Sequence, residues 1–191
     1  MTFSELLALI IQRLERADIP YMVTGSLASS YHGEPRATRD VDIVIDPDPD
    51  TLTRLVEGLA AAGFYVDRDA ALDALATRSQ FNAIGPDASK VDFIIRRDRP
   101  FSIEEFGRRQ AADLLGTPGF VATAEDTVIA KLEWAAATGS DRQLSDVAGI
   151  LSITDRLDIV YIDRWTTALG LEDSWRRLQL ETDEQGRSSD A

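Results

Sequence analysis

The chain has 191 residues, enough to bury one substantial core, so its length favours one domain or one domain with a helical appendage. Its 44% hydrophobic and 28% charged residues are ordinary for a globular protein and exclude the collagenous and low-complexity classes. Twenty basic against thirty-three acidic residues give a net charge of -13, which argues against loose, charge-driven adhesion to DNA or RNA.

The sequence predicts no membrane segment. Its longest apolar run, residues 6–11, is far too short to span a bilayer. Glu5 and the helical pattern around it differ from the basic and then uniformly apolar start of a signal peptide. Cysteine is absent, which excludes disulfides and thiolate zinc sites. We therefore expect a cytoplasmic protein with no membrane partner.

The first forty-five residues predict a helix, a strand, a short helix and a second strand. Residues 2–17 begin with capping-box spacing, and apolar residues then recur at helical intervals. Residues 19–23 are short and β-prone and lead into a turn at Gly25. Residues 27–32 leave room for only a brief helix, and after a loop residues 41–45 form the next strand.

The rest of the chain predicts a second helix–strand group and then helices. A helix opens at Asp50 and is capped near Gly63, and residues 77–84 and 90–95 are predicted to pair as a hairpin. Beyond Pro100 only helices are predicted, at about 102–110, 124–138 and 141–153, with two more ending near residue 181. We therefore expect an α/β core at 1–100, a helical region at 101–181 and a polar, disordered tail at 182–191.

Three aspartates lie in strand-like apolar surroundings. Asp40 and Asp42 share one face of their strand because successive strand side chains alternate, and Asp92 has the same apolar setting at 90–95. If the two strands are neighbours, the carboxylates converge, and a divalent cation relieves their repulsion. Hard oxygen ligands suit Mg²⁺ or Mn²⁺ better than zinc. The pattern predicts a site able to hold two ions, where Asp92 binds the second ion or accepts the proton of an attacking hydroxyl.

Gly25 and Ser26 follow the first predicted strand directly. Gly25 lets the backbone approach a phosphate closely, and Ser26 offers its amide and hydroxyl at the start of a helix, where an anion is favoured. Alone, Gly-Ser is usually a turn and Asp-x-Asp a solvated strand face. In this order and with a third carboxylate on a later strand, the combination is rare by chance and predicts a metal-dependent nucleotide site.

At Gly25-Ser26 and Asp40-Val41-Asp42 the chain resembles the nucleotidyltransferase superfamily of DNA polymerase β, whose signature is Gly-Ser or Gly-Gly followed by Asp-x-Asp. With residues 125–132 and 142–146 in addition, it is similar to the AbiEii-type group, which includes toxins of toxin-antitoxin systems. The resemblance implies an α/β (α+β) fold: a nucleotidyltransferase-like mixed sheet with flanking helices, followed by a C-terminal helical region that closes the cleft.

The resemblance also implies a reaction, partners and site residues. The reaction is magnesium-dependent transfer of a nucleotide from a triphosphate such as ATP to an acceptor hydroxyl. In the toxin branch the acceptor is the 3′ end of tRNA, and an antitoxin protein is the partner. The implied residues are Gly25 and Ser26 for phosphate, Asp40 and Asp42 for metal, Asp92 as third carboxylate, Lys131 for triphosphate charge, and Asp146 to orient Lys131 or the substrate.

Other interpretations stay open. Arg36 and Arg39 flank the metal strand and could reach phosphate or base, although loop arginines are exposed by default. Without the resemblance, Lys131 is a helix residue with its stem on the core and Asp146 a surface acid. His32 is interpreted as packing against or capping the short helix.

Two other functions also remain. One is a small-molecule adenylyltransferase of the aminoglycoside kind, because the acidic balance suits a cationic acceptor as well as it disfavours RNA. The other is a catalytically silent protein of the same fold that binds nucleotide or a partner protein.

Overall fold

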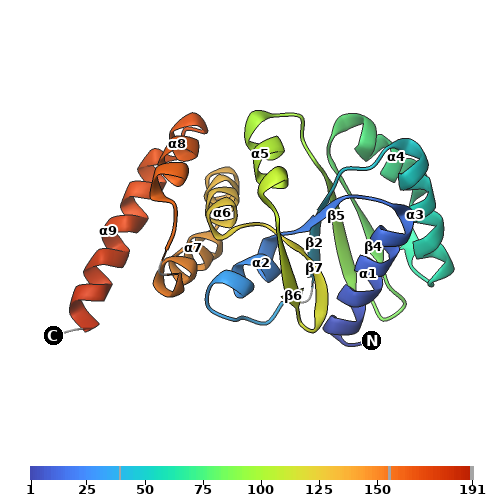
Figure 1. Ribbon diagram of the computed structural model, residues 1–191, viewed down its shortest axis with the longest axis horizontal. Helices are drawn as coiled ribbons and strands as arrows, with labels where there is room; N and C mark the ends of the chain where they lie inside the picture. Colours follow the sequence, from blue (N-terminus) through green and yellow to red (C-terminus); the bar gives the residue numbers. More distant parts are fainter. Residues whose placement is uncertain (39, 155, 190–191) are drawn as a thin grey trace. The chain divides into compact units, whose positions relative to one another are not determined.

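The computed structural model describes residues 1–38, 40–154 and 156–189, with side chains as far as residue 180 (Figure 1). The strands are β1 (Tyr21–Val23), β2 (Asp40–Ile45), β3 (Tyr65–Val66), β4 (Gln80–Ile84), β5 (Lys90–Ile95), β6 (Gln110–Leu114) and β7 (Thr117–Val121). The helices are α1 (Phe3–Ala17), α2 (Gly25–His32), α3 (Pro49–Ala61), α4 (Arg68–Thr77), α5 (Pro100–Arg108), α6 (Ala124–Thr138), α7 (Asp141–Ile153), α8 (Ile159–Ala168) and α9 (Glu172–Ser189).

The described strands form one mixed sheet in the order β3-β4-β5-β2-β1-β7-β6. The β2–β5 and β1–β7 pairs are parallel, and the other neighbours are antiparallel. The helices α1, α3 and α4 lie on one side of this sheet (Figure 1). The expected α/β fold with a mixed sheet and flanking helices is therefore confirmed.

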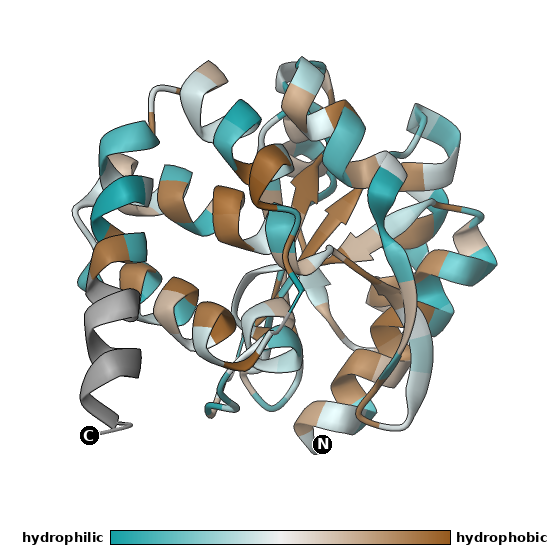
Figure 2. Cartoon of the chain, turned by 60° about the vertical axis from the view of Figure 1, so that its left-hand side comes forward, coloured by the Kyte–Doolittle hydropathy of each residue, from teal (hydrophilic) through white to brown (hydrophobic). Residues whose placement is uncertain are grey.

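One face of the sheet is entirely apolar in its centre. Val41, Ile43 and Ile45 of β2 are completely buried, as are Val91 and Phe93 of β5. The leucines of α1 and α3 that pack in this layer are also buried, because each helix places its apolar residues on one side. Figure 2 shows the central strands in the brown of hydrophobic residues.

The opposite face of the sheet is divided into an apolar and a polar end. Met22 and Val44 are register partners, and together with Ile94 they pack against Phe106 of α5. Toward the start of β2 and β5 the same face instead carries charged side chains. Register partners point to the same side of the sheet. The charged side chains therefore lie on the same face as the hydrophobic cluster that α5 covers, next to it along the strands.

The prediction that only helices follow Pro100 is wrong for residues 110–121, which form the β6–β7 hairpin. The alternation that marks a strand is weak there, because β6 is largely exposed and β7 contains Pro118 and Gly119. The helix α4, absent from the expectations, is capped by Asp67, whose side chain accepts hydrogen bonds from two backbone amides of the first turn. The disordered tail at 182–191 stays a prediction: α9 is assigned as far as Ser189, and residues 190–191 lie outside the described residues.

Two compact units make up the chain. The first comprises Met1–Leu27 and Ala37–Ala122 and contains the sheet; the second comprises Ala28–Arg36 and Thr123–Ala191. In the second unit α6 packs against α7 and α8, and α9 packs against α7 and α8. The predicted domain boundary near Pro100 stays a prediction. Among the described residues no helix has both the length and the apolar character that a membrane span requires.

Candidate active site

The register of two neighbouring strands brings the three predicted carboxylates to one face of the sheet. In the parallel β2–β5 pair, Asp42 lies opposite Asp92, and Asp40 lies opposite Lys90. Parallel strands are roughly 4.8 Å apart, so these four residues are neighbours on one face of the sheet. Asp40 is exposed, whereas Asp42 and Asp92 are half-buried. The surface therefore combines dense negative charge with partial exclusion of water.

The glycine turn lies directly against this group. Gly25 has φ +63°, and a Cβ atom at this position would overlap Asp42 Oδ2 and lie 2.6 Å from Asp42 Cγ. The preceding Thr24 amide donates to the Asp42 carbonyl oxygen at 3.0 Å, which continues the β1–β2 ladder into the turn. Glycine is required here both by the left-handed backbone and by the carboxylate beside it. Ser26 follows in the first turn of α2.

Lys90, which the sequence interpretation missed, supplies a cation within this group. Its Nζ donates to Asp92 Oδ2 at 2.7 Å. The hydrogen bond from Lys90 to Asp92 raises the pKa of Lys90, burial opposes this, and the charges of Asp92, Asp40 and Asp42 raise it further. The sequence feature that could have identified Lys90 is its position two residues before Asp92, which puts both side chains on one face of a strand.

The donor chemistry of this face fits a hard divalent cation. Carboxylate oxygens are the ligands that Mg²⁺ and Mn²⁺ prefer, and Gly25 leaves the space beside Asp42 that any side chain would fill. In the part of the chain that the structure describes, no three acidic or histidine side chains are gathered closely enough to hold a metal ion. The three aspartates are thus neighbours by register, with one oxygen of Asp92 bonded to Lys90.

A second charged cluster lies within the other unit. Asp146 of α7 accepts from Arg36 Nε at 2.8 Å and from Arg36 Nη2 at 3.0 Å, one bond to each carboxylate oxygen. Lys131 Nζ of α6 donates to Asp146 Oδ2 at 2.7 Å. The side chains of Lys131 and Asp146 are 7% and 6% exposed, so this is a largely buried ion pair. Burial alone would raise the pKa of Asp146, but hydrogen bonds and charges from Arg36 and Lys131 outweigh it and lower that pKa.

This cluster bears on three predicted site residues. Asp146 holds both Arg36 and Lys131, so it has the contact with Lys131 that the predicted orienting role requires. Lys131 also has the buried stem that the alternative interpretation expected, because a helical lysine can bury its methylenes and still pair its ammonium. Arg39 lies outside the described residues.

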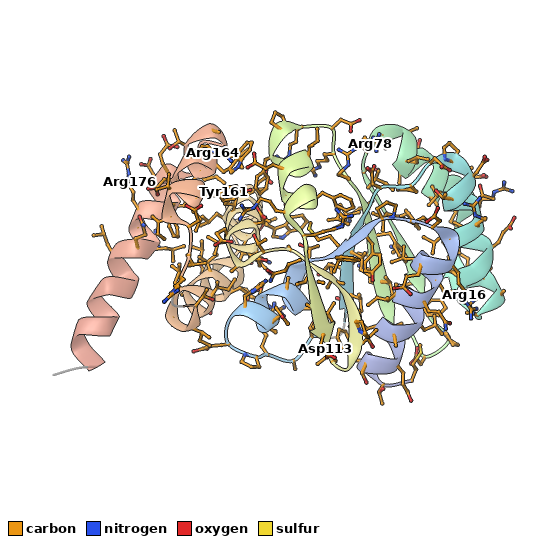
Figure 3. All side chains as sticks on the ribbon, viewed as in Figure 1. Arg16, Arg78, Asp113, Tyr161, Arg164 and Arg176 are labelled. Atoms are coloured by element: carbon orange, nitrogen blue, oxygen red, sulfur yellow. The ribbon has the colours of Figure 1, made fainter. Side chains whose placement is uncertain are left out.

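The remaining candidates have structural contacts. The His32 ring stacks edge-on against Tyr31 at 4.9 Å, and its carbonyl accepts from Thr154. Arg96, which directly follows β5, pairs with Asp46 at 2.8 Å. Arg78, at the end of α4 (Figure 3), joins the same network through Asp46. Arg96 is therefore held within a network of ion pairs at the far end of β2 and β5.

Known structures share this fold. No family model matches the chain, and no curated protein matches its sequence significantly. The antibiotic-resistance factor ANT(2″)-Ia in complex with adenylyl-2″-tobramycin has a TM-score of 0.63 at 14% identity, covering 88% of this chain and 97% of that chain. The lincosamide antibiotic adenylyltransferase LnuA with lincomycin bound has a TM-score of 0.55 at 13% identity, covering 81% and 99%.

A nucleotidyltransferase-like antigenic protein from Paracoccidioides brasiliensis is also similar, with a TM-score of 0.52 at 18% identity over 78% of this chain and 73% of that chain. Identities this low establish the fold and leave the activity to be argued from the site. The chain has the nucleotidyltransferase-like fold that adenylyltransferases also use.

Proposed function

We propose that the protein is a metal-dependent nucleotidyltransferase that moves a nucleotide from a nucleoside triphosphate to an acceptor hydroxyl. The observation that carries this proposal is the shared face of Asp40, Asp42 and Asp92, with Gly25 against Asp42. A solvated strand face would not need a glycine at this contact. The fold supports the proposal because solved structures that share it include adenylyltransferases.

The proposed roles follow from position and charge. Bound Mg²⁺ or Mn²⁺ would neutralise the triphosphate and make the acceptor hydroxyl more acidic. Asp40 and Asp42 hold the cation, and Gly25 and Ser26 hold phosphate through the start of α2. The acceptor oxygen attacks the α-phosphorus, the bond to pyrophosphate breaks, and Asp92 accepts the hydroxyl proton. Lys131 and Arg36 supply positive charge for the phosphates, held by Asp146.

The acceptor that the observations favour is a small cationic polyol. A net charge of -13 attracts a cation and repels a polynucleotide at long range. Two structures with the same fold contain tobramycin in adenylylated form and lincomycin, respectively. Transfer to the 3′ end of tRNA, with an antitoxin protein as partner, is a finer prediction that rests on the AbiEii resemblance alone. The cytoplasmic location is a separate prediction that rests on the absence of a membrane or signal segment from the sequence pattern.

The proposal is tested by following label from each of the four α-³²P nucleoside triphosphates. Tobramycin, lincomycin and total cellular RNA are offered as separate acceptors, with Mg²⁺ and with excess chelator, and pyrophosphate release is measured in parallel. We expect label in a small molecule, dependent on Mg²⁺. Label in the RNA would instead identify the tRNA-modifying alternative.

The matched variants are Asp42→Asn and Asp73→Asn. The first removes a carboxylate charge from the proposed site, and the second removes one from an exposed position on α4. We expect loss of transfer in Asp42→Asn with unchanged unfolding, and full transfer in Asp73→Asn. Nucleotide binding without pyrophosphate release from any triphosphate would establish the catalytically silent alternative.

A further inference from the structure

Lys90 places one ammonium group among the three carboxylates of the acidic face. Its Nζ is 2.7 Å from Asp92 Oδ2, and the charges of Asp40 and Asp42 act on the same ammonium. The register accounts for this position, because Lys90 lies opposite Asp40 and two residues before Asp92 on one strand face. A single positive charge therefore stands where the proposed function requires a divalent cation.

The type of side chain is as informative as its position. Of the twenty basic residues in the chain, only Lys90 and Lys131 are lysines, and both are bonded to predicted site carboxylates. A lysine ammonium is a compact charge on a flexible stem, whereas an arginine holds a carboxylate with a rigid fork. The side chain of Lys90 is 40% exposed, so rotation about its own bonds carries the ammonium into solvent. Lys131, 7% exposed, has no comparable route.

We propose that Lys90 is an internal counter-ion that holds Asp92 in the metal-free protein and moves into solvent when the divalent cation binds. This inference rests on the proposed function, because that function places the cation at Asp40 and Asp42, next to Asp92 on the neighbouring strand. Lys90 is a positioning residue here. It relieves repulsion among the carboxylates before the cation arrives, and it competes with the cation afterwards.

Two opposite effects follow from removing the ammonium. In the metal-free protein the carboxylates lose their counter-ion, so Lys90→Met lowers the melting temperature. With Mn²⁺ present the competitor is gone and the local charge is one unit more negative, so the cation binds more tightly. Because a ligand that binds only the folded state stabilises it, saturating Mn²⁺ raises the melting temperature of Lys90→Met by more than that of the parent.

The decisive measurement is Mn²⁺ affinity, obtained by electron paramagnetic resonance of the free ion with no nucleotide present. A partly exposed ion pair contributes at most about 1 kcal/mol, so we expect Lys90→Met to bind Mn²⁺ about two- to fivefold more tightly than the parent. Lys90→Arg keeps the charge and should retain the parent affinity or weaken it. Asp42→Asn should lose high-affinity binding and marks the site being measured.

The outcomes separate this inference from the proposed function. Equal or weaker Mn²⁺ binding by Lys90→Met overturns the role of Lys90; if Asp42→Asn still abolishes binding, the metal site itself stands. Absence of Mn²⁺ binding from the parent and from every variant overturns both proposals.

A second readout is made on the unsubstituted protein, and a variant serves only to assign its signals. Protein carrying ¹³C at the lysine ε-carbons gives two lysine signals, assigned with Lys131→Arg. Titration with diamagnetic Mg²⁺ should shift and sharpen the Lys90 signal as its ammonium leaves Asp92, while the Lys131 signal stays in place. A stationary Lys90 signal at saturating Mg²⁺ would also overturn the proposal.

Discussion

The α-carbon of Gly25 lies against the carboxylate of Asp42, so closely that one additional carbon would overlap its Oδ2 atom. The two residues come from different elements, Gly25 from the start of α2 and Asp42 from the middle of β2. Their contact ties the proposed phosphate turn to the proposed metal strand. Neither residue can be repositioned without moving the other.

Substitution Gly25→Ala tests this contact. Alanine must adopt φ +63° and must also push the Asp42 carboxylate away. We expect a loss of about 1–3 kcal/mol in the free energy of unfolding in urea. A carboxylate displaced by about 1 Å should also cost on the order of a hundredfold in nucleotide transfer.

The matched control is Gly139→Ala. Gly139 has φ +67° at the end of α6, but a Cβ there meets no atom within 4 Å. It therefore carries the backbone strain without the collision. Equal losses of stability in the two variants, with transfer retained in both, would show that Asp42 accommodates the methyl group.

The acidic face could be predicted from the sequence because strand alternation is a local property. Asp40 and Asp42 share a face in any strand, and the apolar residues around Asp92 identified its strand. Their meeting also needed β2 beside β5, which the sequence left as a condition and the register confirms. The side-chain partner of Asp92 was missed because Lys90, at the beginning of a strand, looks like an ordinary solvated residue.

The contact of Arg36 with Asp146 in the second charged cluster could not be predicted from the sequence. Arg36 precedes Asp146 by 110 positions, and no periodicity relates a loop to a helix at that separation. The packing that joins them depends on Gly33, whose α-carbon faces the backbone of α7. The β6–β7 hairpin was missed for a different reason, because Gly119 and Pro118 lower the strand propensity of β7.

Substitution Asp146→Asn should be strongly destabilising. It leaves the buried ammonium of Lys131 and the guanidinium of Arg36 without their shared carboxylate. Removing one partner of a buried ion pair costs about 3–5 kcal/mol, and we expect a loss near the lower end because asparagine keeps one acceptor oxygen. Urea unfolding at pH 7 measures it. Asp73→Asn, on an exposed helix face, is the control and should change stability by less than about 0.5 kcal/mol.

The difference in stability between the parent and Asp146→Asn should also depend on pH. The pKa of Asp146 in the folded protein lies below its ordinary value of 3.8. A lowered folded pKa means that the carboxylate's contribution is complete above the unfolded pKa and is lost as the pH falls through the folded pKa. The stability difference between parent and Asp146→Asn should therefore stay constant from pH 7 to about pH 5 and shrink below pH 4. A difference that already declines between pH 7 and pH 5 would contradict the assigned cause.

Two glycines that face each other in the second unit should respond in opposite ways to alanine. A Cβ on Gly33 would lie 2.8 Å from the Gly149 carbonyl carbon and 2.8 Å from the Ile150 nitrogen, and backbone atoms cannot rotate away. A Cβ on Gly149 meets its nearest neighbour, the Glu34 Cβ, at an ordinary 3.5 Å. Gly33→Ala should therefore lose about 2–3 kcal/mol of stability. Gly149→Ala should gain up to about 1 kcal/mol, because alanine is the better helix former inside α7.

Urea unfolding of Gly33→Ala, of Gly149→Ala and of the variant with both substitutions measures these effects. A loss of stability in Gly33→Ala alone indicates a collision, whereas losses in both single variants would indicate that this contact tolerates no added volume. If the segment 28–36 is held against α7 by this close approach, Gly33→Ala should also separate Arg36 from Asp146. Asp146→Asn should then cost less free energy of unfolding in the Gly33→Ala background than in the parent, since part of the ion cluster is already broken. An Asp146→Asn loss equal in both backgrounds would place the effect of Gly33 in packing alone, independent of the ion cluster.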